Sequence, residues 1–458
     1  MLAYNYRLLF GIGSLLFSVF TYGQNPVIPN LPVLPTPTTS QIPNYTIQPG
    51  TTSNKKNATP AQLYPSEEQS FQQRQNQNIM NEVEQQEKLR ENAMNEAKAD
   101  IQELISEINY DLPSHSNIEG TKEYVNVYEK MLRLDIESYS IKDVNFDIEN
   151  AYFENKLDKA EFDKTIKQSA DFILAKIKER NFDMNNNTAK NFMLFEFFTQ
   201  PMQVKGFKEK HFPIKYDFED YWGRNDWSKM FVTKLLKTNS GQCHSMPLLY
   251  LTLAEAIGAE AYLSLSPNHS YIKFQDEKGK WYNLELTNGM LTVSSFILNN
   301  GFITAEAIQN KIYMQNLTKQ QMLSQFYTDL ASGYLHKFGY DGFVDKVINK
   351  ALELYPTSIN ANIVKANYNE ARLKYVFKKL GINTQTQDGR NKILNYPKSI
   401  EILQQMHAQY KIVDDLGFQL MSADAYEKWL GSLKETKNKE ESEKLAKQFK
   451  GTIIKLKN

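Results

Sequence analysis

The sequence predicts an α+β protein in which a helix and a small antiparallel sheet form a core between flanking helical segments. Three observations favour this class. Long stretches before residue 200 and after residue 314 repeat apolar residues at helical spacing. A dense apolar run, residues 248–257, follows a glycine and a cysteine. Two later stretches alternate polar and apolar residues with the two-residue period of strands.

Composition narrows the function classes. The 458 residues allow about three domains of roughly 150 residues each. Because 53 basic residues balance 53 acidic residues, no global charge attracts nucleic acid, and we expect no nucleic-acid partner. The sequence has no apolar run of about 18 residues, which argues against a multi-pass membrane protein. With one cysteine, the chain forms no internal disulfide.

The first 23 residues are predicted to be a signal peptide. Arg7 precedes an apolar stretch, residues 8–20, and a small residue, Gly23, stands before the expected cleavage point. As a helix this stretch rises about 20 Å, less than the roughly 30 Å hydrocarbon core. We therefore expect a secreted or periplasmic protein. The alternative is an uncleaved signal anchor. Apart from such an anchor, we expect no contact of the protein with a membrane.

Residues 24–65 hold nine of the 16 prolines and are predicted to be a Pro/Thr-rich disordered linker. Residues 66–200 are predicted to be a helical segment. It begins with a long amphipathic helix, because apolar residues from Ile79 to Ile108 recur at helical spacing. Gln86 and Lys88 interrupt the stripe, so packing on the chain's own body is favoured over a coiled coil.

A cysteine stands near the start of the apolar helix. Pro247 is tolerated only in a first turn, so the helix is expected to begin near Cys243. A thiol at a helix N-terminus meets the positive end of the helix dipole, which favours the thiolate. A strand is expected next, over residues 260–266.

The two alternating stretches predict an antiparallel hairpin around a turn at residues 276–280. His269, Tyr271 and Gln275 share one face of the first strand, and Trp281 and Glu285 share a face of the second. Burying the aliphatic residues together fixes the register, since a one-residue slip would turn them outward. If Gln275 pairs with Trp281, Glu285 lies opposite Tyr271 and diagonal to His269, about 7–8 Å away.

These three residue types predict a cysteine–histidine–acid triad. Cys243 would attack a carbonyl carbon as thiolate, His269 would carry the proton, and Glu285 would hold the imidazole. The backbone N–H of Cys243 would stabilise the oxyanion. A second donor is not assigned, and Gln242, Asn225 and Trp227 are weak candidates.

The segment resembles the transglutaminase-like superfamily of papain-type folds. Three motifs carry the resemblance in order and spacing over about 50 residues: Gly241-Gln242-Cys243, Asn268-His269-Ser270 and Trp281-Tyr282-Asn283-Leu284-Glu285. The resemblance implies a core over residues 201–314 and acyl transfer through a thioester at Cys243. The acid position carries Glu285 where the family usually has Asp. The family also contains members that have lost activity.

Several alternatives stand beside this interpretation. Cys243 would be inert filler of an apolar helix, or His244 would act as the base in place of His269. A zinc site made of Cys243, His244, His269 and Glu285 lacks a metal-binding spacing pattern, so no metal is predicted. Tyr271 and Trp281 would line a substrate cleft or pack across strands. Residues 216–231 would form a cleft wall or domain core.

Residues 315–458 are predicted to be helical and similar to tetratricopeptide repeats. Ala351 stands five residues before Pro356, as at the end of such a repeat, and helices are expected over residues 361–380, 400–416 and 423–433. The last two are expected to pair. Irregular helical hairpins remain the alternative, because one repeat is recognisable and stable arrays need about three. Repeat helices would offer a surface to a protein partner.

The sequence thus predicts an exported thiol-dependent hydrolase or acyltransferase acting on peptide or isopeptide amide bonds, without a cofactor. Its substrate would be a peptide or protein. The alternative is a catalytically inactive peptide-binding scaffold with helical repeats.

Overall fold

The computed structural model describes residues 67–106, 108–292, 294–298 and 302–432, with residues 443, 444 and 447. The predicted signal peptide, residues 1–23, and the predicted linker, residues 24–65, lie outside the described residues. The chain divides into two compact units. Among the described residues, the larger unit comprises residues 111–383 and the part of the chain from Pro397 onward, and the smaller comprises residues 67–110 and Thr384–Tyr396.

The smaller unit contains the long predicted helix. This helix, α1 (Glu67–Ser106), begins before the apolar pattern does, because the glutamate, glutamine and arginine residues ahead of the pattern favour helix. The apolar side chains along α1 are exposed: Ile79, Met80, Val83, Leu89 and Met94. The expectation that this apolar stripe packs on the chain's own body stays a prediction. The unit also holds α13 (Gln387–Lys392) and the 3₁₀-helix η4 (Ile393–Asn395).

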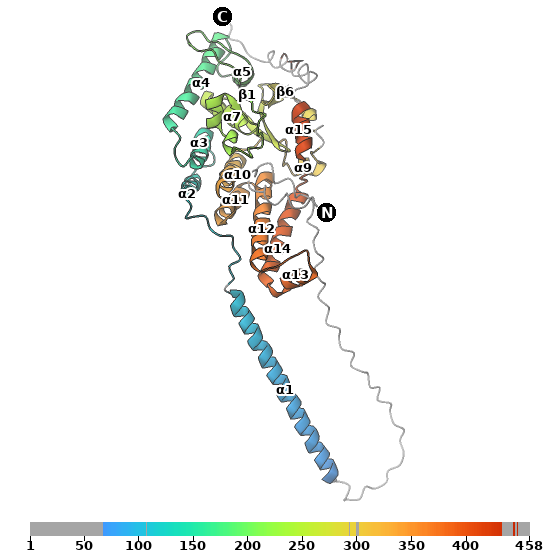
Figure 1. Ribbon diagram of the computed structural model, residues 1–458. Coiled ribbons are helices and arrows are strands. Elements are labelled where there is room, and N and C mark those ends of the chain that lie inside the picture. The colour runs from blue at the N-terminus through green and yellow to red at the C-terminus, as the bar shows by residue number, and fades with distance from the viewer. Residues whose placement is uncertain are drawn as a thin grey trace, which may run out of the picture. The chain divides into compact units, whose positions relative to one another are not determined.

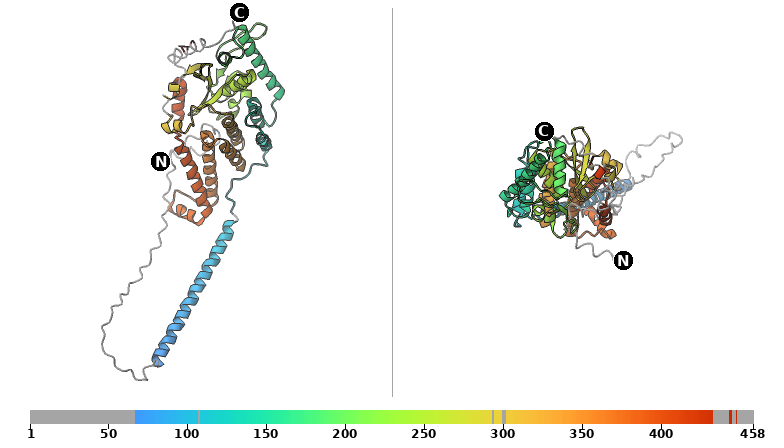
Figure 2. Two further views of the ribbon diagram at one scale, coloured as in Figure 1. Left: turned by 180° about the vertical axis from the view of Figure 1, so that it is seen from behind. Right: turned by 90° about the horizontal axis from the view of Figure 1, so that it is seen from above.

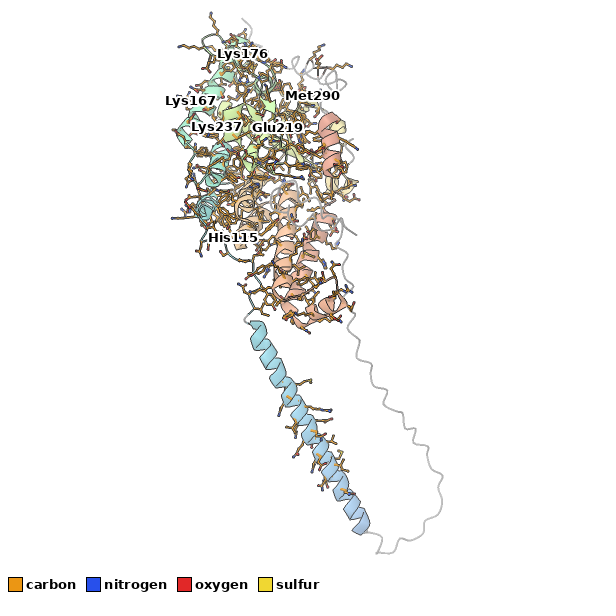
Figure 3. The ribbon with its side chains drawn as sticks, viewed as in Figure 1. His115, Lys167, Lys176, Glu219, Lys237 and Met290 are labelled. Atoms are coloured by element: carbon orange, nitrogen blue, oxygen red, sulfur yellow. The ribbon has the colours of Figure 1, made fainter. Side chains whose placement is uncertain are left out.

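The larger unit contains four helices before residue 200, where the sequence predicts a helical segment. They are α2 (Thr121–Met131), α3 (Ile141–Tyr152), α4 (Lys159–Glu179) and α5 (Asn187–Thr199). Three of them begin at a polar cap, because the side chains of Ser140, Asp158 and Asn186 accept backbone N–H groups of the first turn. Figure 3 shows the side chains of this unit, and Lys167 points outward from α4.

The central element is α7 (Ser245–Ile257). It contacts α3, α4, α5 and α6 (Val232–Thr238), as well as two strands of the sheet. A helix that is apolar on all sides is buried on all sides, and α7 follows this rule. Just before it, β1 (Lys215–Tyr216) pairs in parallel with β2 (Ser240–Gly241). The 3₁₀-helix η3 (Trp227–Met230) lies between them in the chain.

A four-stranded antiparallel sheet follows α7 in the order β3-β4-β5-β6. Its strands are β3 (Tyr262–Ser266), β4 (His269–Gln275), β5 (Trp281–Glu285) and β6 (Met290–Thr292). Gln275 pairs with Trp281, so the predicted register of the hairpin is confirmed. The described chain is therefore mixed, with a small antiparallel sheet among many helices, which agrees with the predicted α+β class.

Two short helices, α8 (Ser294–Leu298) and α9 (Ala305–Gln309), end the stretch predicted as the core. Residues 315–432 are mainly helical, as predicted, and most of residues 433–458 lie outside the described residues. The helices of this part are α10 (Lys319–Phe338), α11 (Gly342–Leu354), α12 (Ile359–Lys379), α14 (Pro397–Asp415) and α15 (Ala423–Ser432). α10 packs against α11, and α12 packs against α14 (Figure 1). α10 also packs on α3, so these helices share a core with the sheet and α7. Among the described helices, none combines the length and apolar character needed to cross a bilayer.

The sequence predicts that the helix at residues 423–433 pairs with the helix at residues 400–416. The structure places this helix, α15, elsewhere. α15 packs its aromatic residues on the α+β core instead: Tyr426 contacts Trp222, and Trp429 contacts His269. Figure 2 shows this helix, in red, beside the sheet when the unit is seen from behind. The expected pairing is corrected because Tyr426, Trp429 and Leu430 share one face of the helix, and that face matches an aromatic surface.

Candidate active site

Cys243 lies in the turn that joins β2 to α7. α7 begins at Ser245 with His244 as its N-cap, so Cys243 is the residue directly before the N-cap. The Ser245 hydroxyl accepts the backbone N–H of Gln242 at 2.9 Å, which holds the turn closed. Gly241 allows the close packing here, because a Cβ at this position would come within 2.5 Å of a Leu235 methyl carbon.

His269 and Glu285 form a buried pair on neighbouring strands. The Nε2 atom of His269 lies 2.7 Å from Oε2 of Glu285, and the two side chains are 1% and 7% exposed. The other carboxylate oxygen, Oε1, accepts the backbone N–H of Thr287 at 2.9 Å. The predicted juxtaposition of this histidine and this carboxylate is therefore present, and the carboxylate is fixed from both sides.

The thiol and the imidazole are neighbours. With Nε2 turned to Glu285, the buried Nδ1 atom has no hydrogen-bond partner at good geometry among the described residues. Cys243 nevertheless lies close enough to act on the pKa of the ring. The Ser270 hydroxyl donates to the backbone carbonyl of Cys243 at 2.5 Å, which ties the start of β4 to the cysteine turn.

The electrostatics of the pair favour the charged imidazole. Burial alone lowers the pKa of His269, but the charge of Glu285 and hydrogen bonding with Cys243 and Glu285 outweigh burial and raise it to about 10. For Glu285, burial raises the pKa, and the charge and hydrogen bond of His269 more than offset this, so the net pKa is lowered. Each member of the pair thus stabilises the ionised form of the other.

The third side of the sulfur is covered by α15, which sequence reasoning did not place at the site. The Tyr426 hydroxyl oxygen lies 3.8 Å from the Cys243 Sγ atom, and the Trp429 ring centroid lies 4.8 Å from that of His269. Cys243 is in consequence 2% exposed. Burial, and next the charge of Cys243, raise the pKa of Tyr426, so its hydroxyl stays protonated and donates. The signal in the sequence was the spacing of Tyr426, Trp429 and Leu430 on one helical face.

Gln242 is close to the site, whereas the other two predicted substrate contacts are not at the sulfur. The buried Gln242 amide lies 3.5 Å from the carbonyl of Asp220, and its Oε1 atom has no partner among the described residues. Tyr271 is buried opposite Ser264 of β3. Trp281 is 40% exposed at the far end of the hairpin, where its ring packs on Tyr262. Of the two roles expected for Trp281, the structure shows packing across strands.

His244 points away from the thiol. Its Nε2 atom lies 3.5 Å from the Asp329 carboxylate on α10, as expected for a neighbour on diverging helical positions. Asn225 is exposed, and Trp227 stacks on His336. Neither contacts the turn, so Gln242 is the remaining side chain near the expected oxyanion.

Residues 216–231 divide between the two expected roles. Tyr216 and Trp222 face the site, because the Trp222 ring lies 4.9 Å from that of Tyr426 and the Tyr216 hydroxyl interacts with both Cys243 and Tyr426. Trp227, Met230 and Phe231 form a small separate core. The first part of the segment is thus a wall of the site, and the second part is domain core.

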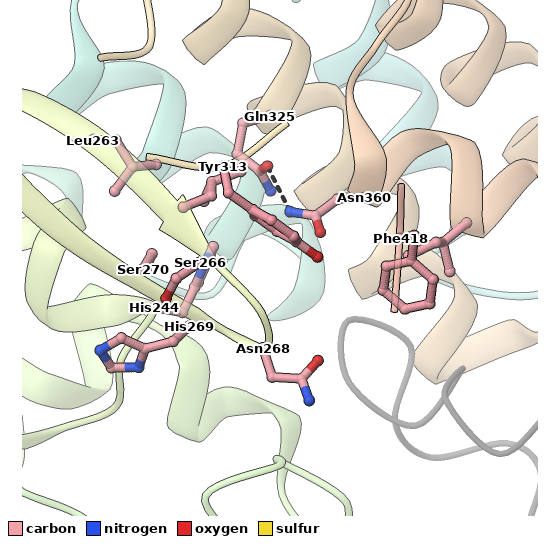
Figure 4. Close-up of a pocket in the computed structure, with 12 residues that line it drawn as sticks. His244, Leu263, Ser266, Asn268, His269, Ser270, Tyr313, Gln325, Asn360 and Phe418 are labelled. Atoms are coloured by element: carbon pink, nitrogen blue, oxygen red, sulfur yellow. Dashed lines mark hydrogen bonds between the residues drawn. The ribbon is translucent and has the colours of Figure 1, made fainter. Parts of the chain in front are cut away.

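A small polar pocket lies behind His269. Its volume is about 40 Å³, and its polar lining includes His244, Asn268, Gln325 and Asn360. Asn360 donates to the Gln325 side chain at 3.0 Å, as the dashed line in Figure 4 shows. His269 lies at the edge of the group of lining residues in the same view. The pocket therefore backs the site and does not contain the sulfur.

Comparisons with known proteins assign no family. No protein-family model and no curated protein matches the chain. Among solved structures, one whose title reads "Crystal structure of menin reveals the binding site for Mixed Lineage Leukemia (MLL) protein" is similar over 73% of this chain and 98% of that chain, at 12% identity and a TM-score of 0.30. A likeness of this size carries no argument about function.

Proposed function

We propose that Cys243, His269 and Glu285 form a thiol-dependent acyl-transfer site that acts on peptide or isopeptide amide bonds. The observation that carries the proposal is the 2.7 Å contact between His269 and Glu285 beside the Cys243 turn. A nucleophile, a base and a group that orients the base are the three parts that such chemistry needs. Three separate elements, the β2–α7 turn, β4 and β5, supply them.

The chemistry follows from these positions. Cys243 Sγ gives its proton to His269 Nδ1 and attacks the amide carbonyl carbon, so that a carbon–sulfur bond forms and the carbonyl oxygen becomes an oxyanion. The carbon–nitrogen bond then breaks, and the leaving amine takes a proton from His269 Nδ1. Water or another amine next attacks the thioester and gives its proton to His269. The carbon–sulfur bond breaks, and the sulfur of Cys243 is released for another cycle.

The Cys243 backbone N–H is the main candidate oxyanion donor. It makes no hydrogen bond to another group within the part of the chain that the structure describes. It also stands just before the α7 N-terminus, whose dipole stabilises negative charge. The Gln242 amide is a second candidate, since its bond to the Asp220 carbonyl is long at 3.5 Å.

The proposal includes a transglutaminase-like fold for the core. The cysteine turn before a buried helix, the histidine strand and the tryptophan-led strand ending in an acid support a transglutaminase-like core. Export to the periplasm or beyond the cell is proposed from residues 1–23. A protein partner on the repeat-like helices is proposed from α10, α11, α12 and α14.

Thiol reactivity tests the proposal. Iodoacetamide should label Cys243 in the folded protein several-fold faster than in His269→Ala, because the proposed site uses the imidazole as the base for the thiol. The chain has one cysteine, so the label counted by mass spectrometry reports this site alone. A matched control is His244→Ala, whose side chain faces Asp329 and should leave the rate unchanged. Equal rates in the wild type and His269→Ala would remove His269 as the base.

The alternative function is a catalytically inactive peptide-binding scaffold. One observation favours it: the sulfur is 2% exposed beneath α15. On this alternative, Cys243→Ser would bind the same peptides as the wild type, and no peptide amide would be hydrolysed by either. Turnover that is lost in Cys243→Ser decides for the enzyme.

A further inference from the structure

Two side chains of α15 lie against the proposed catalytic groups, and Cys243 is buried. A reacting carbonyl carbon needs to approach the sulfur to roughly 3–3.5 Å. The Tyr426 hydroxyl oxygen already lies 3.8 Å from this sulfur. The Trp429 ring packs edge-on against the His269 imidazole. An acyl group that contacts both Cys243 and His269 would compete with these two side chains for the same space.

The surface beneath α15 is aromatic and suits a particular kind of ligand. Tyr221 and Trp222 lie with ring centroids 5.6 Å and 4.9 Å from the Tyr426 ring. The buried Tyr216 completes this wall beside the sulfur. Tilted aromatic pairs at such separations are favourable beyond the area that they bury. The surface therefore recognises aromatic side chains, whichever segment carries them.

The attachment of α15 is suited to release. α15 has ten described residues, and a helix of that length is marginal in water unless it is docked. The buried Trp429 indole N–H has no hydrogen-bond partner among the described residues, which reduces the net gain from docking. At the rim, the Tyr221 hydroxyl donates to the exposed Glu427 carboxylate at 2.6 Å.

We propose that α15 is an internal occupant of the substrate site, and that a peptide carrying aromatic side chains displaces it to reach Cys243. The inference rests on the proposed function, and it names both the substrate class and the regulation of that site. In the closed form the thiol is shielded. In the open form Tyr216, Tyr221 and Trp222 receive an aromatic residue of the substrate next to the reacting carbonyl.

The first experiment measures iodoacetamide labelling of Cys243 in the full chain. Trp429→Ala should label at least about tenfold faster than the wild type, because the docked face of α15 loses its largest side chain. Lys428→Ala changes an exposed residue of the same helix and should label at the wild-type rate. Circular dichroism confirms that each variant is folded, and Leu430→Ala, on the buried face, replaces Trp429→Ala if that variant does not fold.

A second experiment tests the ligand class. A synthetic peptide with the sequence of residues 421–432 should slow the labelling of Trp429→Ala, because it restores both aromatic rings to the exposed surface. The same peptide with its tyrosine and tryptophan replaced by alanine should not slow it. Protection by both peptides, or by neither, would overturn the assignment of an aromatic-binding surface.

The two proposals fail in different ways. Unchanged labelling in Trp429→Ala and Leu430→Ala overturns the occupant role of α15, whatever His269 does. Faster labelling in Trp429→Ala that stays as fast in the His269→Ala, Trp429→Ala double variant supports the occupant role and overturns the catalytic pair. Faster labelling that drops in the double variant supports both.

Discussion

At the residue scale, the length of the Glu285 side chain explains how its carboxylate reaches His269. The register places Glu285 diagonal to His269 on the next strand, a separation of about 7–8 Å between backbone positions. The additional methylene carries the carboxylate to 2.7 Å from Nε2. Alternation in the sequence predicted this pair because strand register follows from aliphatic burial. It did not predict which ring nitrogen is used, because that depends on side-chain rotamers and on the Thr287 N–H.

Glu285→Gln should lower the pKa of His269. The carboxylate charge is the largest influence that raises this pKa to about 10, and the amide keeps the shape but removes the charge. We expect the pKa to fall by roughly 1 to 3 pH units, the size of a close charge effect. NMR titration of the histidine ring protons measures it. Glu277→Gln, on the hairpin turn, is the control, and an unchanged His269 titration in Glu285→Gln would contradict the pairing.

At the element scale, the turn before α7 depends on the absence of a side chain at Gly241. The first motif of the predicted active site contains this glycine, and packing gives its physical reason, since Leu235 and Met246 leave no room for a Cβ. The sequence predicted the helix start within two residues because Pro247 restricts it. It could not predict the docking of α15, since the aromatic surface that receives α15 comes from residues about 200 positions earlier.

Gly241→Ala should destabilise the protein and disturb the cysteine turn. The new methyl group would overlap Leu235 and Met246, and overpacking of this kind costs about 1–3 kcal/mol. Urea denaturation measures the free energy of unfolding. Gly342→Ala is the matched control, because nothing lies within 4 Å of the position a Cβ would occupy there. Equal stability of the two variants would contradict the close packing at Gly241.

At the scale of the whole molecule, local pattern predicted elements better than their partners. Helical spacing identified α12, α14 and α15, and alternation identified β4 and β5. The packing of α10 on α3 joins segments almost 200 residues apart, and no local period encodes that contact. The sequence likewise indicated Cys243, His269 and Glu285 from motif order, whereas the cover by Tyr426 and Trp429 required coordinates.

The stability of the folded chain should carry a signature of the buried imidazole. The His269 pKa rises from the ordinary value of 6.5 to about 10, so the folded state binds a proton more tightly than the unfolded state. The resulting stabilisation is fully present below about pH 6.5 and is lost as the pH rises toward 10. Over this window, we expect the unfolding free energy of the wild type to fall by up to about 1.4 kcal/mol per pH unit more than that of His269→Ala.

Denaturant titrations of both proteins between pH 6 and pH 10 test this expectation. The difference between the two slopes reports the His269–Glu285 pair, because the pKa of Glu285 also depends on the imidazole, whereas groups away from the pair contribute equally to both proteins. Parallel profiles would show that the imidazole is not held in its charged form.

The placement of Tyr426 and Trp429 also bears on how long the protein keeps its chemistry. Peroxides convert accessible thiolates to sulfenic acid and then to products that do not revert. Because the single thiol, Cys243, is 2% exposed, collisions with small oxidants are rare in the closed form. The Cys243 thiol would thus be oxidised slowly in the closed form and faster in the open form that binds substrate.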